Sequence, residues 1–66
     1  MAEAVRVETV RRAFAEVTGE LEDATLIATE GQATMDLVAA RRSCDRLIES
    51  LESCNAQLQR LRRRLG

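Results

Sequence analysis

The chain has 66 residues, of which 45% are apolar and 32% are charged, and its formal net charge is −1. This balance is typical of a globular or coiled-coil protein and excludes a disordered one. A chain of this length forms one folding unit at most, so residues 1–66 are expected to be a single module. A module this small buries little surface, and association with another chain is a common way to stabilise it.

The sequence contains no run of about 18 apolar residues, so no membrane-spanning helix is expected. Its first residues include acids and no apolar segment, which excludes a signal peptide at this position. We therefore expect a soluble, intracellular protein in the cytoplasm, with reduced cysteines.

The first predicted element is a helix over about residues 3–30. Its apolar residues recur at alternating spacings of three and four, which is the seam pattern of a coiled coil. The seam consists of Val7, Val10, Phe14, Val17 and Leu21, continued by Ala24 and Ala28.

A turn over about residues 31–34 is predicted to follow. Gly31 can adopt the left-handed conformation that ends a helix, and Thr34 can then cap the next helix with Asp36 in its first turn. A competing interpretation makes Thr29 and Gln32 a capping box that starts the second helix earlier. That alternative would place Gly31 inside the first turn of a helix, so a start at Thr34 is preferred.

The second predicted helix covers about residues 35–65 and has a longer seam. This seam consists of Leu37, Ala40, Cys44, Leu47, Leu51, Cys54, Leu58, Leu61 and Leu65. If the first seam is continued at the same spacing into the second half of the chain, the second seam lies two residues away from it. A coiled coil absorbs an insertion of four or three residues, but not of two, so the pattern favours a fold-back over one continuous rod. We predict an all-α, antiparallel, coiled-coil-like hairpin of two helices, completed by oligomerisation into a helical bundle.

The charge distribution also favours a fold-back. Residues 1–36 hold three arginines and eight acids, whereas residues 37–66 hold seven arginines and three acids. Unlike halves attract each other when they lie side by side. The fold-back is expected to bring together the following charges: Glu20, Glu22 and Asp23 with Arg41 and Arg42, and Glu3 with Arg60.

Several apolar residues lie off both seams and gather on either side of Gly31. A hairpin has one inner face, so apolar residues beyond it need another chain to bury them. The candidate partner interface consists of Leu26, Ile27, Met35, Val38 and Ile48.

No catalytic, cofactor-binding or metal-binding residues are expected. The acids lie beside no histidine or glycine-rich loop, and two cysteines without a histidine do not complete a zinc site. Cys44 and Cys54 are ten residues apart on one helix, too far for a disulfide within the chain, and are expected to be small core residues. The basic end, "QRLRRRLG", suits the negative end of a helix dipole better than nucleic acid, which is not an expected partner.

The predicted function is a non-enzymatic helical module for protein–protein interaction, a small structural or adaptor subunit of a larger assembly. Its partner is either a second copy or another helical protein. An alternative is a small acidic chaperone that sheathes a partner helix. Size, acidity and hairpin architecture resemble the small needle-chaperone subunits of type III secretion. A third alternative is an RNA-binding hairpin dimer similar in architecture to ROP, against which the acidic first helix argues.

Overall fold

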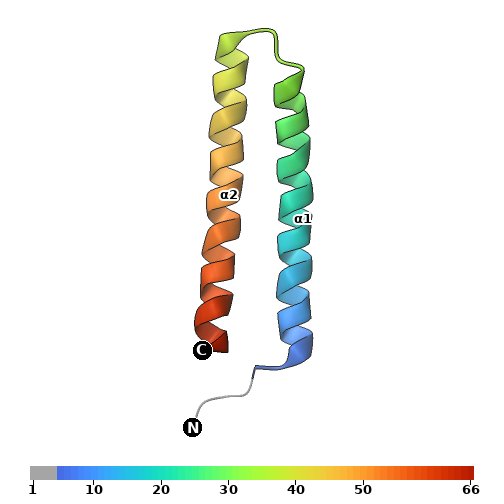
Figure 1. Cartoon of the computed structure of the whole chain (residues 1–66), viewed down its shortest axis with the longest axis vertical. Coiled ribbons are helices and arrows are strands. Elements are labelled where there is room, and N and C mark those ends of the chain that lie inside the picture. Colours follow the sequence, from blue (N-terminus) through green and yellow to red (C-terminus); the bar gives the residue numbers. More distant parts are fainter. Residues whose placement is uncertain (1–4) are drawn as a thin grey trace.

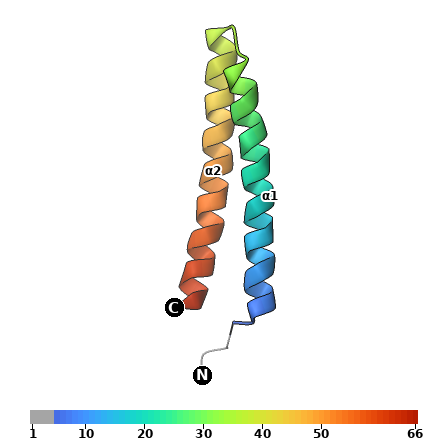
Figure 2. The ribbon, with the colours of Figure 1, turned by 45° about the vertical axis from the view of Figure 1, so that its right-hand side comes forward.

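The computed structural model describes residues 5–66 as two long helices joined by a short turn. Helix α1 (Val7–Gln32) has 26 residues and α2 (Leu37–Leu65) has 29. The helices run antiparallel and side by side along their whole length (Figures 1 and 2). Within residues 5–66 there is no strand, and the predicted all-α helical hairpin is confirmed. Neither described helix is apolar enough along its length to cross a membrane.

Helix α1 continues beyond the predicted break at Gly31. It ends at Gln32, and the N–H of Ala33 donates to the carbonyl of Glu30 at 3.1 Å. Ala33 has ordinary right-handed dihedrals, with φ −91° and ψ 0°. Among the described residues only Gly66 has a positive φ. The prediction that Gly31 ends the helix in a left-handed conformation is therefore wrong, because a right-handed last residue needs no glycine.

Helix α2 is capped by Asp36 rather than by Thr34. The Asp36 backbone is extended, with φ −137° and ψ 127°, and its side chain accepts a hydrogen bond from the N–H of Val38 at 2.8 Å. An N-cap residue needs this extended backbone so that its carboxylate can reach the free N–H groups of the first turn. The N–H of Thr34 instead donates to the carbonyl of Gly31 at 3.2 Å. The connection thus covers residues 33–36, two residues later than predicted.

Three threonines of α1 form hydrogen bonds to earlier residues of their own helix. The hydroxyls of Thr18, Thr25 and Thr29 donate to the carbonyls four residues earlier, at 2.9–3.0 Å. A threonine that bonds in this way is an interior helix residue, not a cap. The alternative in which Thr29 and Gln32 start the second helix is therefore wrong.

The two helix termini at the open end of the hairpin, opposite the turn, differ in how they are capped. The first turn of α1 follows Arg6, which makes no side-chain cap, and contains one acid, Glu8. The last turn of α2 holds Arg62, Arg63 and Arg64, which suit the negative end of the helix dipole. The predicted start of the first helix at residue 3 lies outside the described residues.

Candidate functional site

The contact between the two helices is lined mainly by small and polar residues. Seven buried or half-buried residues of α1 recur at spacings of three and four: Val10, Ala13, Val17, Glu20, Ala24, Ile27 and Gly31. Seven of α2 recur in the same way: Ala40, Ser43, Leu47, Ser50, Cys54, Gln57 and Leu61. Four further half-buried residues, Thr9, Gly19, Ala39 and Leu58, lie outside these two series. Only Val17, Ala24, Cys54 and Leu61 are fully buried. We call the fourteen residues of the two series the inner seam.

On each helix the inner seam keeps half of the predicted seam. In place of the other half it has the residues one position earlier in the sequence. Seven residues belong to both: Val10, Val17, Ala24, Ala40, Leu47, Cys54 and Leu61. Eight predicted members are exposed instead, namely Val7, Phe14, Leu21, Ala28, Leu37, Cys44, Leu51 and Leu65, while Leu58 is half-buried. These nine residues therefore lie outside the inner seam.

The physical reason lies in side-chain size. Alanine, serine and glycine let two helices approach closely, and at the tip a Cβ built on Gly31 would lie 3.9 Å from the Cβ of Ser43. Large side chains such as Phe14 between the helices would hold them apart. Small residues therefore take half of the inner seam, which keeps Ile27, Leu47 and Leu61 as large members, and Phe14 stands beside it.

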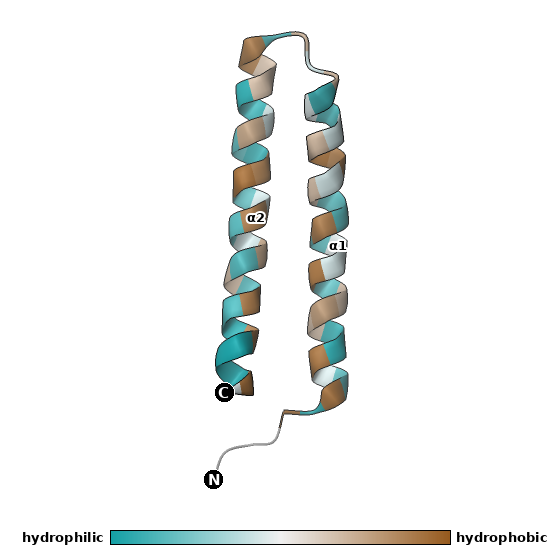
Figure 3. Cartoon of the chain, in the orientation of Figure 1, coloured by the Kyte–Doolittle hydropathy of each residue, from teal (hydrophilic) through white to brown (hydrophobic). Residues whose placement is uncertain are grey.

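Residues beside the inner seam, most of them large, form one row on each helix. On α1 the row is Val7, Phe14, Leu21 and Ala28; on α2 it is Cys44, Leu51, Leu58 and Leu65. Members of a row are seven residues apart, two helical turns, and so lie on one side of their helix. Ala28 and Cys44 line the same surface hollow, so both rows lie on the same side of the hairpin. We call these eight residues the apolar face, and the brown segments along both ribbons in Figure 3 show how apolar residues recur on the two helices.

The antiparallel register pairs the two rows residue by residue. Gly31 lies opposite Ser43, and each seven-residue step toward the start of α1 matches one toward the end of α2. The pairs from the tip to the open end are therefore Ala28 with Cys44, Leu21 with Leu51, Phe14 with Leu58, and Val7 with Leu65. Every pair is apolar, and Phe14 is 51% exposed although it is the single aromatic residue of the chain. Exposure of this kind is typical of an interaction surface.

A hollow lies at the tip end of the apolar face. Its volume is about 320 Å³, and its lining includes Ile27, Ala28, Ala40, Cys44 and Leu47. Small side chains at Ala28 and Ala40 leave this space open between the helices. An engineered apolar cavity of about 150 Å³ is enough to bind benzene, so this hollow has room for an aromatic side chain.

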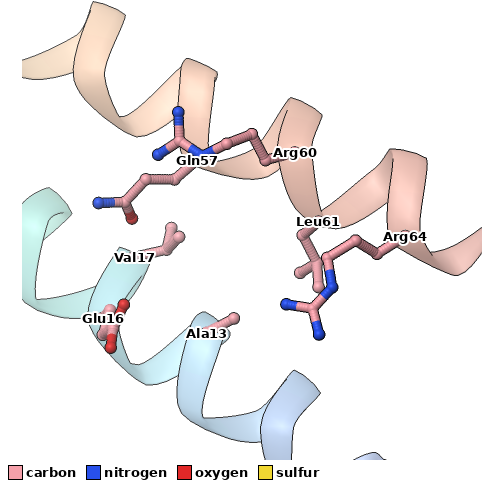
Figure 4. Close-up of a pocket in the computed structure, with 7 residues that line it drawn as sticks. All are labelled: Ala13, Glu16, Val17, Gln57, Arg60, Leu61 and Arg64. Carbon is pink, nitrogen blue, oxygen red and sulfur yellow. The ribbon is translucent and has the colours of Figure 1, made fainter. Parts of the chain in front are cut away.

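The opposite edge of the inner seam carries charge. There a second hollow of about 260 Å³ lies near the open end, between Glu16 on one helix and Arg60 and Arg64 on the other (Figure 4). Its floor is formed by Val17 and Leu61 of the inner seam. This edge is polar. Its charged side chains are better suited to setting the orientation of a partner than to burying apolar surface.

Charge is divided strongly along the length of the hairpin. The open half, residues 5–19 and 53–66, holds seven arginines and two glutamates, a net of +5. The tip half, residues 20–52, holds eight acids and three arginines, a net of −5. The pairs expected around Arg41 and Arg42 do not form, because the register places these arginines opposite the end of α1 and several turns from Glu20. The pairing expected for Glu3 lies outside the described residues.

The residues predicted as a partner interface differ in exposure. Leu26, Met35, Val38 and Ile48 are exposed, Met35 by 99%. Ile27 is half-buried and lines the tip hollow, so it belongs to the inner seam. Ile48 follows Cys44 by one helical turn and widens the apolar face. Leu26 and Val38 point away from that face.

One carboxylate is placed unfavourably within the inner seam. Glu20 is half-buried, and its Oε1 atom is buried without a hydrogen-bond partner. The register sets it opposite the buried thiol of Cys54, which offers only a weak donor. Among residues 5–66, no three metal-ligating side chains gather into a site. The chain matches no protein-family model, no curated protein and no solved structure.

Proposed function

We propose that this protein is a helical module for protein–protein interaction, a small structural or adaptor subunit that docks through its apolar face. The observation that carries the proposal is the run of four apolar pairs, from Ala28 with Cys44 at the tip to Val7 with Leu65 at the open end. All but Leu58 are exposed in the single hairpin. Residues buried by a partner would be the main source of binding energy, since the inner seam buries few large side chains.

The size of the surface supports this proposal. The hairpin measures 55 × 16 × 9 Å, and the apolar face runs along its longest dimension. A standard protein–protein interface buries roughly 800 Å² on each partner, which a face of this outline can supply. A 26-residue helix packed against one neighbour gains little from propensity alone and is stabilised further by a second neighbour.

The test uses charge placed at the middle of the face. The variant Leu21→Asp with Leu51→Asp puts two carboxylates where the proposal needs burial. Its matched control is Ala15→Asp with Gln59→Asp, which adds the same charge at exposed positions on the outer side of each helix. Circular dichroism first establishes that both variants remain helical.

Tagged forms of all three proteins are then used to capture partners from the native source, and the mass of each intact complex is measured. We expect the wild type and the control to form the same complex, and the face variant to lose it. A complex that survives in the face variant contradicts the proposal.

The same experiment separates the chaperone alternative. A chaperone that sheathes a partner helix would be weakly folded alone and would gain helix when that partner is added. A structural subunit would instead be recovered in a stable complex of fixed stoichiometry. An RNA partner would be lost steeply as salt is raised, in the face variant and the wild type alike.

A further inference from the structure

The apolar face is complementary to the same face of a second hairpin whose long axis runs in the opposite direction. We propose that a second copy of this chain covers the face with its tip over the open end of the first, which makes an antiparallel four-helix bundle. This inference rests on the proposed function, because it names the partner of the same face. Two independent observations support it, one of charge and one of side-chain size.

The charge halves determine the orientation. The tip half carries −5 and the open half +5. Two copies with their tips at the same end would place like charge on like charge over the whole length. Two copies with their tips at opposite ends place each acidic half on a basic half. Electrostatic complementarity of this kind selects orientation and suppresses the wrong arrangement.

Side-chain size selects the same orientation. The pair nearest the tip is small, Ala28 with Cys44, and the pair at the same distance on the other side of the centre is large, Phe14 with Leu58. With opposed tips, the Phe14–Leu58 pair of each copy faces the Ala28–Cys44 pair of the other copy, and the Leu21–Leu51 pair faces its own counterpart. With tips together, large would face large and small would face small, which leaves one layer overfilled and another underfilled.

The centre of the contact then lies at Leu21 and Leu51. Leu51 is the middle residue of α2 (Leu37–Leu65), and the register places Leu21 beside it. A twofold axis through this point sets each of these leucines near its own counterpart. Such an interface uses the same surface on both copies and closes as a dimer.

The tip hollow supplies the most specific contact. The twofold axis carries Phe14 of the second copy over Ala28, at the hollow of about 320 Å³. The hollow is lined almost wholly by apolar atoms and is large enough for a phenyl ring. The single aromatic residue of the chain is therefore buried twice per dimer, once in each hollow.

The first experiment measures the mass of the purified protein over a range of concentrations by sedimentation equilibrium. We expect a monomer–dimer equilibrium that Phe14→Ala weakens by at least about tenfold, because a buried aromatic side chain is lost from each hollow. The control Ala15→Asp with Gln59→Asp should dimerise like the wild type. A monomer at all concentrations overturns the second copy as partner but leaves the capture experiment free to find another protein on the face.

The second experiment measures orientation within the dimer. Met35→Cys in a Cys44→Ala background takes one spin label at the fully exposed tip, because Cys54 is buried. Opposed tips place the two labels roughly 40 Å or more apart, since α2 alone is about 43 Å long, whereas tips together place them within about 20 Å. The long distance supports the proposal, and the short distance overturns it. A dimer that persists in Leu21→Asp with Leu51→Asp shows that another surface associates and overturns the second copy as the occupant of the apolar face, while the capture experiment still tests the proposed function.

Discussion

Gly31 of α1 and Ser43 of α2 face each other across the tip of the hairpin. A Cβ built on Gly31 would meet the Cβ of Ser43 at 3.9 Å, an ordinary van der Waals distance, and its φ is not in the left-handed region. Alanine therefore fits without strain. We expect Gly31→Ala to stabilise the hairpin by about 0.5–1 kcal/mol, because glycine in a helix interior loses more conformational entropy.

Gly19 provides the matched control for this prediction. A Cβ at Gly19 meets nothing within 4 Å, so Gly19→Ala gains helix propensity without any contact between the helices. Thermal unfolding followed by circular dichroism should show a similar gain for both variants. A loss of stability for Gly31→Ala alone would mean that the helices cannot accept a methyl group at the tip.

The cap of α2 gives a second prediction. The Asp36 carboxylate accepts from the N–H of Val38 at 2.8 Å, and no other side-chain cap serves this helix start. We expect Asp36→Ala to lower the free energy of unfolding by roughly 0.5–2 kcal/mol, and Asp36→Asn to retain most of it. Thr34→Ala is the control and should change little. Urea unfolding measures all three, and equal losses at Thr34 and Asp36 would contradict the assignment of the cap.

The helical hairpin could be predicted from the sequence, but the side on which its large residues lie could not. The spacing of three and four shows that Val10, Phe14 and Val17 share a stripe, and the change of register shows that the stripe is interrupted. The spacing does not show whether the stripe faces the other helix of the same chain or a different molecule. The predicted seam and the inner seam share half their residues, and the other half differ by one position along the helix, so spacing alone does not distinguish them.

Residues with weak hydrophobic signals decided the inner seam. Ser43 and Ser50 of α2 lie inside, although serine gives no apolar periodicity, and Glu20 lies inside although glutamate argues against burial. Their smallness, or the flexibility of their side chains, is what allows the helices to approach. A search for small residues at spacings of three and four would have found Ala13 and Ser43. The predicted end of α1 is also wrong, because Gly31 was expected to end the helix and instead lies within it.

Glu20 gives a third prediction. Its Oε1 atom is buried without a partner inside the seam, and an unsatisfied buried polar atom costs about 1–3 kcal/mol. Because Glu20 is only half-buried, we expect Glu20→Ala to stabilise the hairpin by an amount near the lower end, about 1 kcal/mol. Glu22→Ala, on the exposed side of α1, is the control for the removal of one negative charge. A loss of stability on urea unfolding of Glu20→Ala would indicate that the carboxylate has a partner in solution.

The fourth prediction separates the two orientations of a dimer by size alone. With opposed tips, Ala28 faces Phe14 of the other copy, so Ala28→Leu overfills that layer and weakens dimerisation. With tips together, Ala28 faces the small Cys44, and the same variant fills a void and strengthens dimerisation. Overpacking costs typically about 1–3 kcal/mol, which corresponds to a dissociation constant raised roughly 5- to 150-fold. Sedimentation equilibrium reports the sign directly, and a tighter dimer would contradict the opposed arrangement.

The fifth prediction concerns the two cysteines, which differ in exposure. Cys54 is buried in the inner seam with 5% of its surface exposed, and Cys44 is exposed on the apolar face. In dilute protein, iodoacetamide should modify Cys44 much faster than Cys54, because access limits the reaction of a buried thiol. As the concentration rises and the dimer forms, Cys44 becomes covered by Leu58 of the other copy. Its rate of modification should then fall at least tenfold, because iodoacetamide reaches the thiol only when the dimer opens. Mass spectrometry of timed samples gives both rates. In Leu21→Asp with Leu51→Asp the Cys44 rate should not depend on concentration, and a rate that is equally independent in the wild type would show that this face stays uncovered.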